Sequence, residues 1–136
     1  MAKTSDVDLS LPILPDMELT AVTVAESLGV FIGLDKDKID EVKLALIEAC
    51  INAFEHSKDR DRKINLNFQI TDNAMVISIS DDGEGFDIDE AKDRIAAKRN
   101  KGEKRGWGLT LMSKLMDEVE IDSSEKGTLV RLTKSR

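Results

Sequence analysis

The stretch from Asp35 to about Ser57 constrains the fold most strongly, because it combines an apolar helical pattern with a row of polar residues. Its apolar residues form two arcs around the helix. They are Val42, Leu46, Cys50 and Ala53 in one arc, and Leu44, Ile47, Ile51 and Phe54 in the other. A helix of this kind is mostly covered by other parts of its protein, so we expect it to be central to the fold.

Three polar residues interrupt that apolar surface at regular intervals. Glu48, Asn52 and His56 recur every four residues and therefore line one face of the helix. Burying a carboxylate, an amide and an imidazole without partners is costly. The row therefore either satisfies loop ends and its own members, or it forms part of a ligand site.

The composition indicates one soluble globular domain over residues 1–136. No apolar run is long enough to span a bilayer, and the first residues lack the apolar core of a signal peptide. Cys50, the single cysteine, falls on an apolar arc and is interpreted as a small buried residue. Together these features predict a reduced, cytoplasmic setting without membrane contact.

Charge is distributed unevenly along the chain. The net charge is −7, which argues against direct nucleic-acid binding. Residues 92–105 nevertheless contain seven basic and two acidic residues. This segment either receives a small anion or is an ordinary solvated basic surface.

The flanking segments alternate between strand and helix patterns. Alternation at Val7, Leu9 and Leu11 predicts a first strand that ends at Pro12 and Pro15. From Asp16 the pattern is helical and Gly33 lies near its end. The apolar residues expected on one side of this helix are Leu19, Val22, Ala25 and Val30.

The remaining strands come in two pairs. The first pair has alternating residues at 64–70 and 75–79, with turn residues at 71–73 between the strands. In the second pair, apolar residues at 119 and 121 and at 130 and 132 flank a turn at 123–127. Strands with one apolar face and helices available as cover predict an α/β (α+β) fold, a two-layer sandwich of a mixed sheet with helices on one face.

Two glycine-containing segments are candidate ligand loops. In the first, Gly83 and Gly85 would let a flat ring approach the backbone, and an ionised Asp81 accepts hydrogen bonds, as an exocyclic amine requires. In the second, Gly106 and Gly108 open a helix whose free N–H groups suit phosphate oxygens. Either segment alone is also compatible with an ordinary turn.

The polar row supplies the remaining chemistry. The amide oxygen of Asn52 is a suitable Mg²⁺ ligand, and Glu48 could accept a proton from a hydroxyl or orient it. His56 lies farther along the same face, where a hydrogen bond that holds the helix end is the simpler interpretation. Lys104 and Arg105, just before the second glycine pair, could reach terminal phosphates.

The order of these motifs is more specific than any one of them. Glu-x-x-x-Asn-x-x-x-His is followed by Asp-x-Gly-x-Gly, a basic segment and Gly-x-Gly-Leu, with Gly127-Thr128-x-Val130 before the last strand. This order resembles the Bergerat-fold ATPases of the GHKL superfamily. Within that superfamily the chain is most similar to the small anti-sigma-factor serine/threonine kinases of bacteria.

The resemblance implies a role for each matching residue, with an ATP lid at about 87–105. Glu48 would be the general base or orient the hydroxyl, Asn52 would bind magnesium, and Lys104 or Arg105 would act from the lid. The residues implied to contact ATP or ADP are Asn52, His56, Asp81, Gly83, Gly85, Phe86, Gly106, Trp107, Gly108, Leu109 and Thr128. Trp107 could instead be only a hydrophobic contact under the lid.

The implied activity is transfer of phosphate from MgATP to a Ser or Thr of a STAS-domain anti-sigma-factor antagonist. Sequestration of a sigma factor and formation of a homodimer are further family expectations. Residues 16–34 contain no Lys or Arg, although this region contributes to the partner surface in sigma-binding relatives, so the output could differ. The alternatives left open are a nucleotide-gated binding module without useful kinase activity, and a scaffold in which the motifs are purely structural.

Overall fold

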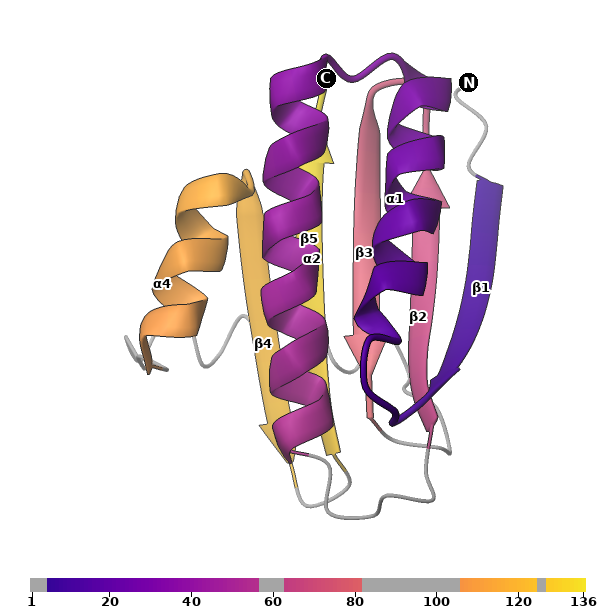
Figure 1. Ribbon diagram of the computed structural model, residues 1–136. Helices are drawn as coiled ribbons and strands as arrows, with labels where there is room; N and C mark the ends of the chain where they lie inside the picture. Colours follow the sequence, from indigo (N-terminus) through magenta and orange to yellow (C-terminus); the bar gives the residue numbers. More distant parts are fainter. Residues whose placement is uncertain (1–4, 57–62, 82–105, 125–126) are drawn as a thin grey trace.

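The computed structural model describes residues 5–56, 63–81, 106–124 and 127–136, and Figure 1 shows how their helices and strands are arranged. In chain order these elements are β1 (Ser5–Pro12), α1 (Glu18–Ile32), α2 (Lys36–His56), β2 (Lys63–Ile70), β3 (Ala74–Ser80), α4 (Gly106–Leu115), β4 (Glu118–Ser124) and β5 (Gly127–Ser135). Each of them corresponds to an element that the sequence pattern predicts.

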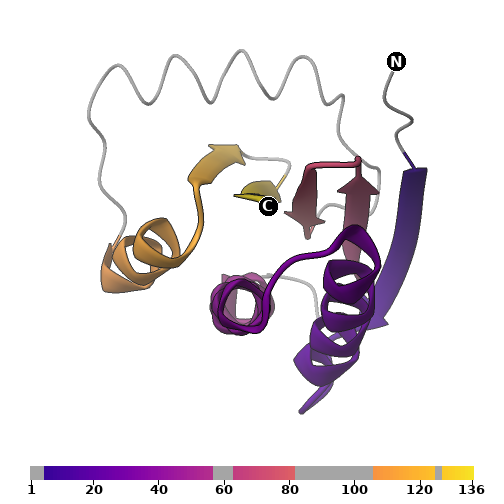
Figure 2. The same cartoon turned by 90° about the horizontal axis from the view of Figure 1, so that it is seen from above.

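Within the described residues, the strands form one five-stranded sheet in the order β1-β2-β3-β5-β4. Every neighbouring pair among them is antiparallel. The prediction of a mixed sheet was therefore wrong. The prediction of an α/β sandwich with helices on one face was right, and Figure 2 shows α1, α2 and α4 on the same side of the sheet.

The connections explain why no parallel neighbours arise among the described strands. Two consecutive helices, α1 and α2, separate β1 from β2, so the chain returns to the sheet in the opposite direction. The connection from β3 through α4 to β4 does make those two strands run in the same direction. However, β5 lies between them and pairs with both.

The core lies between the helices and one face of the sheet. In β2, alternate residues from Ile64 to Ile70 are buried, whereas Asn65, Asn67 and Gln69 on the other face are half-buried. This alternation is typical of an antiparallel strand with only one covered face. The buried row meets the face of α2 that carries Ala45, Leu46, Ala49 and Cys50, each with 0% of its surface exposed.

Helix α1 differs from the prediction in the residues that it buries. Its buried residues are Ala21, Val22, Ala25, Gly29 and Ile32. Leu19 and Val30, which were expected on the buried side, are 52% and 66% exposed. A Cβ atom on Gly29 would lie 3.0 Å from Ile39 Cγ1 of α2. The buried side thus contains small residues that let the two helices approach closely, and a search for large apolar residues overlooks them.

Helix α2 is also less covered than its two apolar arcs predict. In the first arc, Val42, Leu46 and Cys50 are fully buried, as expected, whereas Ala53 is half-buried. In the second arc, Leu44 is 55% exposed and the others are half-buried. The reason is that the sheet covers only one side of α2, while α1 and α4 flank it (Figure 2) and leave an outer strip open to solvent.

Cys50 is the only cysteine of the chain, and its thiol is buried in the core. Burial raises the pKa of the thiol to about 12, because the thiolate would lose its hydration. The interpretation of Cys50 as a small buried residue is therefore confirmed. Among the residues described, none belongs to a helix with the length and hydropathy needed to cross a bilayer.

Replacing Phe68 should test where the core lies. Phe68 is 0% exposed at the centre of β2, so Phe68→Ala should lower the free energy of unfolding by about 3–5 kcal/mol. Phe31→Ala is the matched control, because Phe31 is 78% exposed and its loss should change stability by no more than about 0.5 kcal/mol. Urea denaturation of the three proteins measures both values, and similar losses for the two variants would contradict this assignment of the core.

Candidate functional site

Helix α2 contributes Glu48 and Asn52 from a position between its buried side and its outer strip. Both residues are half-buried. Glu41 lies seven residues before Glu48 and is therefore on nearly the same side of α2. It pairs with Lys134, and Lys134 also bonds to Leu115, the last residue of α4. The polar row therefore faces α4. His56 is the last residue of α2, and its side chain lies outside the described part of the structure.

Asp81 directly follows β3 and joins the end of that strand to the start of β5. Its side chain is buried, with 7% of its surface exposed. The backbone N–H of Thr128 donates to Asp81 Oδ1 at 2.7 Å, and the N–H of Asp81 donates to the carbonyl of Thr128 at 3.3 Å. The carboxylate is therefore held in one orientation by the backbone of the neighbouring strand.

Helix α4 begins at Gly106, as the sequence predicts. The N–H groups of the first turn of a helix have no partner within that helix, and the aligned peptide dipoles make this end positive. The backbone of Gly106, Trp107, Gly108 and Leu109 forms that first turn. The side chains of Trp107 and Leu109 lie outside the described part of the structure.

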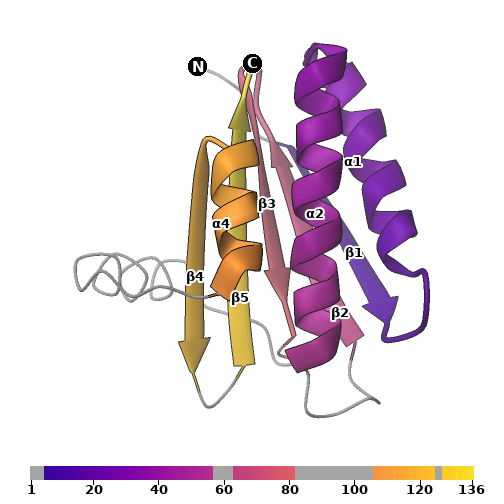
Figure 3. The same ribbon diagram turned by 60° about the vertical axis from the view of Figure 1, so that its left-hand side comes forward.

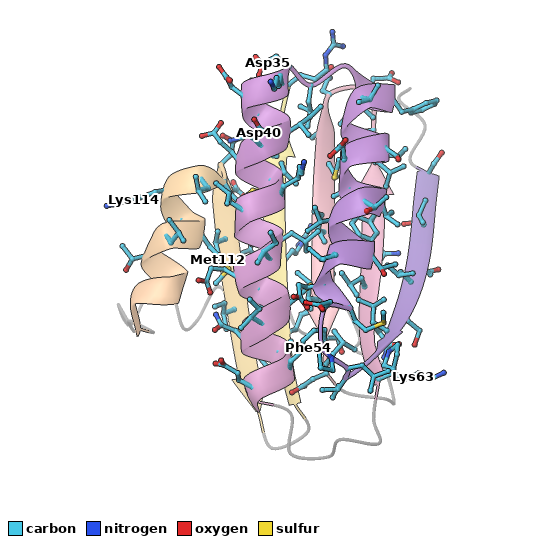
Figure 4. The ribbon with its side chains drawn as sticks, in the orientation of Figure 1. Asp35, Asp40, Phe54, Lys63, Met112 and Lys114 are labelled. Atoms are coloured by element: carbon cyan, nitrogen blue, oxygen red, sulfur yellow. The ribbon has the colours of Figure 1, made fainter. Side chains whose placement is uncertain are left out.

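The directions of the elements bring these residues to one end of the molecule. The C-terminal ends of α2 and β3 and the N-terminal ends of β5 and α4 point the same way (Figure 1), and Figure 3 shows the same arrangement from another side. Figure 4 places Phe54 near this end of α2 and Asp35 and Asp40 at the opposite end. Asp81 and Thr128 therefore meet where β3 ends and β5 begins, α2 runs toward this end of the sheet, and α4 runs away from it beside α2 and β4.

Five predicted site residues cannot be compared with this arrangement. Gly83, Gly85, Phe86, Lys104 and Arg105 lie outside the described residues, as does the segment 87–105 predicted to be a lid. The functional assignments of these residues therefore remain predictions.

The sequence reasoning missed a polar contact at the end of β5 that lies away from Asp81 and Thr128. Lys134 is 5% exposed and lies between β5, α2 and α4, where its ammonium contacts Glu41 and the carbonyl of Leu115. The available signal was the alternation in β5, since Lys134 continues the core-facing row of Val130 and Leu132. A lysine at a core position needs partners, and that requirement could have drawn attention to it.

The fold is a two-layer α/β sandwich with helices on one face of the sheet, and it has polar residues on the side of its central helix and a buried carboxylate where two neighbouring strands meet. Residues 12–134 match the family described as histidine kinase-like ATPase domain. The chain therefore belongs to the family of histidine kinase-like ATPase domains, which makes it a nucleotide-binding protein.

Two relatives specify the part of this family to which the chain is similar. It is 36% identical over 102 residues to an anti-sigma F factor of Bacillus velezensis, a match that covers 72% of this chain and 70% of the relative. It is 27% identical over 139 residues to the serine-protein kinase RsbW of Bacillus subtilis, covering 94% of this chain and 84% of that protein.

A solved structure supports the fold. The crystal structure of the RsbU and RsbW domains of a Mycobacterium tuberculosis protein matches with a TM-score of 0.70 and 22% identity. The match covers 97% of this chain and 33% of that longer protein. Nearly the whole chain therefore corresponds to one part of a larger protein.

Substitutions of Asp81 should separate its structural role from its charge. Asp81→Ala removes the acceptor of the part-buried Thr128 N–H and should lower the free energy of unfolding by about 1–3 kcal/mol. Asp81→Asn keeps an oxygen that can accept this bond, so we expect a smaller loss. Urea denaturation measures both, and equal losses in the two variants would show that the hydrogen bond to Thr128 contributes little.

Proposed function

We propose that this chain is an ATP-dependent serine/threonine-protein kinase of a bacterial partner-switching system, which phosphorylates a STAS-domain anti-sigma-factor antagonist in the cytoplasm. The observation that carries the proposal is the bond between the Asp81 carboxylate and the Thr128 backbone at the end of β3, with α2 running toward this end of the sheet and α4 running away from it. The names of the two curated relatives, an anti-sigma factor and a serine-protein kinase, agree with it.

In this proposal Asp81 recognises adenine. One carboxylate oxygen accepts the Thr128 N–H, and a carboxylate has further acceptor capacity for the exocyclic amine of the base. Because the side chain is buried and already fixed, little entropy is lost when the base binds. Thr128 would contribute beside the base, and Gly83, Gly85 and Phe86 would complete this part of the pocket.

The phosphates would extend from adenine toward α4. The N–H groups of the first turn of α4, at Gly106 and Gly108, would receive their oxygens, with Trp107 and Leu109 between and after them. Lys104 or Arg105 would neutralise the terminal phosphate. The basic charge of residues 92–105 in an otherwise acidic protein supports an anionic ligand.

Asn52 would hold the magnesium ion that accompanies ATP. Among the described residues, no group of three or more histidine, cysteine, aspartate or glutamate side chains is arranged to hold a metal. Magnesium commonly keeps several waters and takes one or two protein oxygens together with phosphates, so one half-buried amide facing α4 fits it. Bound there, the ion would neutralise charge on the phosphates.

Glu48 would act on the attacking hydroxyl. It lies one turn before Asn52 on the same side of α2 and is half-buried, so a partner protein can approach it from solvent. Its carboxylate would accept the proton of the serine or threonine hydroxyl as the oxygen–phosphorus bond forms and ADP leaves. His56, the last polar residue of this row, would hold the end of α2 by a hydrogen bond.

The proposal also covers the proteins that this chain would bind. We include sequestration of a sigma factor, which the name of one relative suggests, and assembly as a homodimer. The exposed side of α1 has apolar residues such as Phe31, and the helix contains no basic residue. A partner that binds this surface would therefore rely on apolar contacts more than on acidic side chains of its own.

Glu48→Gln should separate binding from catalysis. The amide keeps the size of the side chain but cannot take a proton, so phosphoryl transfer should fall by about 10²–10⁴-fold, the scale of general-base catalysis. The affinity for MgADP, measured by calorimetry, should stay unchanged. Glu55→Gln is the matched control, because Glu55 is exposed on the same helix and the change in net charge is identical.

The decisive experiment is incubation with labelled ATP and a purified STAS-domain protein encoded beside this chain, followed by mapping of the modified residue. A labelled serine or threonine that disappears with Glu48→Gln supports the proposal. A stable complex of the two proteins without phosphate transfer would favour a nucleotide-gated binding module. Asp81→Asn should at the same time reduce the preference for ATP over GTP, since the amine of adenine loses its acceptor.

A further inference from the structure

Lys134 places an ammonium group inside the core. It follows Val130 and Leu132 on the side of β5 that faces the helices, and it pairs across the sheet with Met75 of β3. Only 5% of its surface is exposed. A buried charge of this kind is stable only with close partners, so its contacts are specific features of the fold.

The partners of Lys134 come from two different helices. Its Nζ donates to the carbonyl of Leu115, the last residue of α4, at 2.5 Å and lies 3.3 Å from Glu41 Oε1 of α2. A positive group is favoured at the C-terminus of a helix, where carbonyls lack intrahelical partners. One side chain of β5 therefore bonds to both α2 and α4.

A second contact fixes the same corner of the chain. Asp117, two residues after α4, accepts the N–H of Ser135 on its Oδ2 at 2.6 Å and donates its own N–H to the carbonyl of Thr133 at 2.9 Å. The end of α4 is therefore held by directional bonds to both neighbours of Lys134 in β5.

The apolar contacts of α4 define its position along the helix axis less sharply than these hydrogen bonds do. Met112 of α4 and Met116, directly after the helix, are 1% and 5% exposed, and Figure 4 shows Met112 between α4 and α2. Methionine is unbranched and adapts to shifted surroundings. Such contacts hold α4 against α2 but permit sliding along the helix axis, whereas hydrogen bonds to Lys134 do not.

Fixing the C-terminal end of α4 also fixes the position of its N-terminal end. Helix α4 has ten residues and is about 15 Å long, and a helix this short is nearly rigid. Its glycine-bearing start is the proposed phosphate site. Glu41, the other partner of Lys134, is on the same side of α2 as Glu48 and lies seven residues before it.

We propose that Lys134 is a positioning residue for phosphoryl transfer: it fixes α4 along its axis relative to α2, so that the first turn of α4 faces Asn52. The proposal rests on the nucleotide site described above. Lys134 would not touch the nucleotide itself.

The variant Lys134→Met tests this role because methionine has a similar volume and suits a core position. The Glu41 side chain is 40% exposed and can be hydrated once the ammonium is gone, so no buried charge is left unpaired and the variant should fold. We expect its affinity for MgADP to fall about ten-fold, because the phosphates depend on α4. Its affinity for adenosine, measured by NMR titration, should stay unchanged, because the base depends on Asp81.

Lys38→Met is the matched control. Lys38 of α2 donates to the carbonyl of Ser135 at 3.3 Å, so it also joins α2 to β5, but it is not bonded to α4. The two substitutions change the net charge equally, and Lys38→Met should bind both ligands as the unmodified protein does. Equal weakening of MgADP and adenosine by Lys134→Met, or a loss matched by Lys38→Met, would overturn the proposal.

Hydrogen exchange of the nucleotide-free protein separates this proposal from the nucleotide site itself. Lys134→Met should speed exchange of the α4 amides at least several-fold relative to those of α1, and Lys38→Met should not. If the unmodified protein binds neither MgADP nor adenosine, the proposed function fails. The exchange rates then still decide whether Lys134 fixes α4, and unchanged rates would reject it.

Discussion

The pairing of β5 with both β3 and β4 is the constraint on which the rest of the structure depends. At its start, the backbone of Thr128 holds the Asp81 carboxylate. In its middle, Val130 and Leu132 belong to the core beneath the helices. Near its end, Lys134 bonds to α2 and α4. Strand β5 thus connects the proposed adenine site to the helix that would bind phosphate, and its backbone is hydrogen-bonded to β3 and β4 along the way.

Local patterns were sufficient to predict the elements but not their arrangement. The alternation in β2 and the glycines at the start of α4 are set by neighbouring residues, and the structure confirms both. The insertion of β5 between β3 and β4 depends on pairing between distant segments, which no periodicity records. The expected mixed sheet was wrong for that reason, since a helix between two strands suggests that these strands are parallel neighbours.

The candidate site was predictable to a similar extent. Glu48, Asn52 and Asp81 were singled out from residue type and spacing, and their functional roles stay predictions; the structure adds that Asp81 is buried and bonded to the Thr128 backbone. The buried side of α1 was predicted only in part: Val22 and Ala25 are buried as expected, but small residues such as Gly29 take the place of Leu19. Lys134 was missed because its partners lie on other elements, and only the fold reveals that a lysine is acceptable at a core position.

Helix α2 shows how one element can provide both rigidity and chemistry. Its inner side is dry enough that burial raises the pKa of the Cys50 thiol to about 12. Asn52, two residues later, and Glu48, two residues earlier, are half-buried at the boundary with solvent. A carboxylate on the dry side would resist ionisation, whereas one far out in water would gain little from neighbouring groups. The boundary combines a fixed backbone with access to solvent, and the role proposed for Glu48 toward a protein substrate needs both.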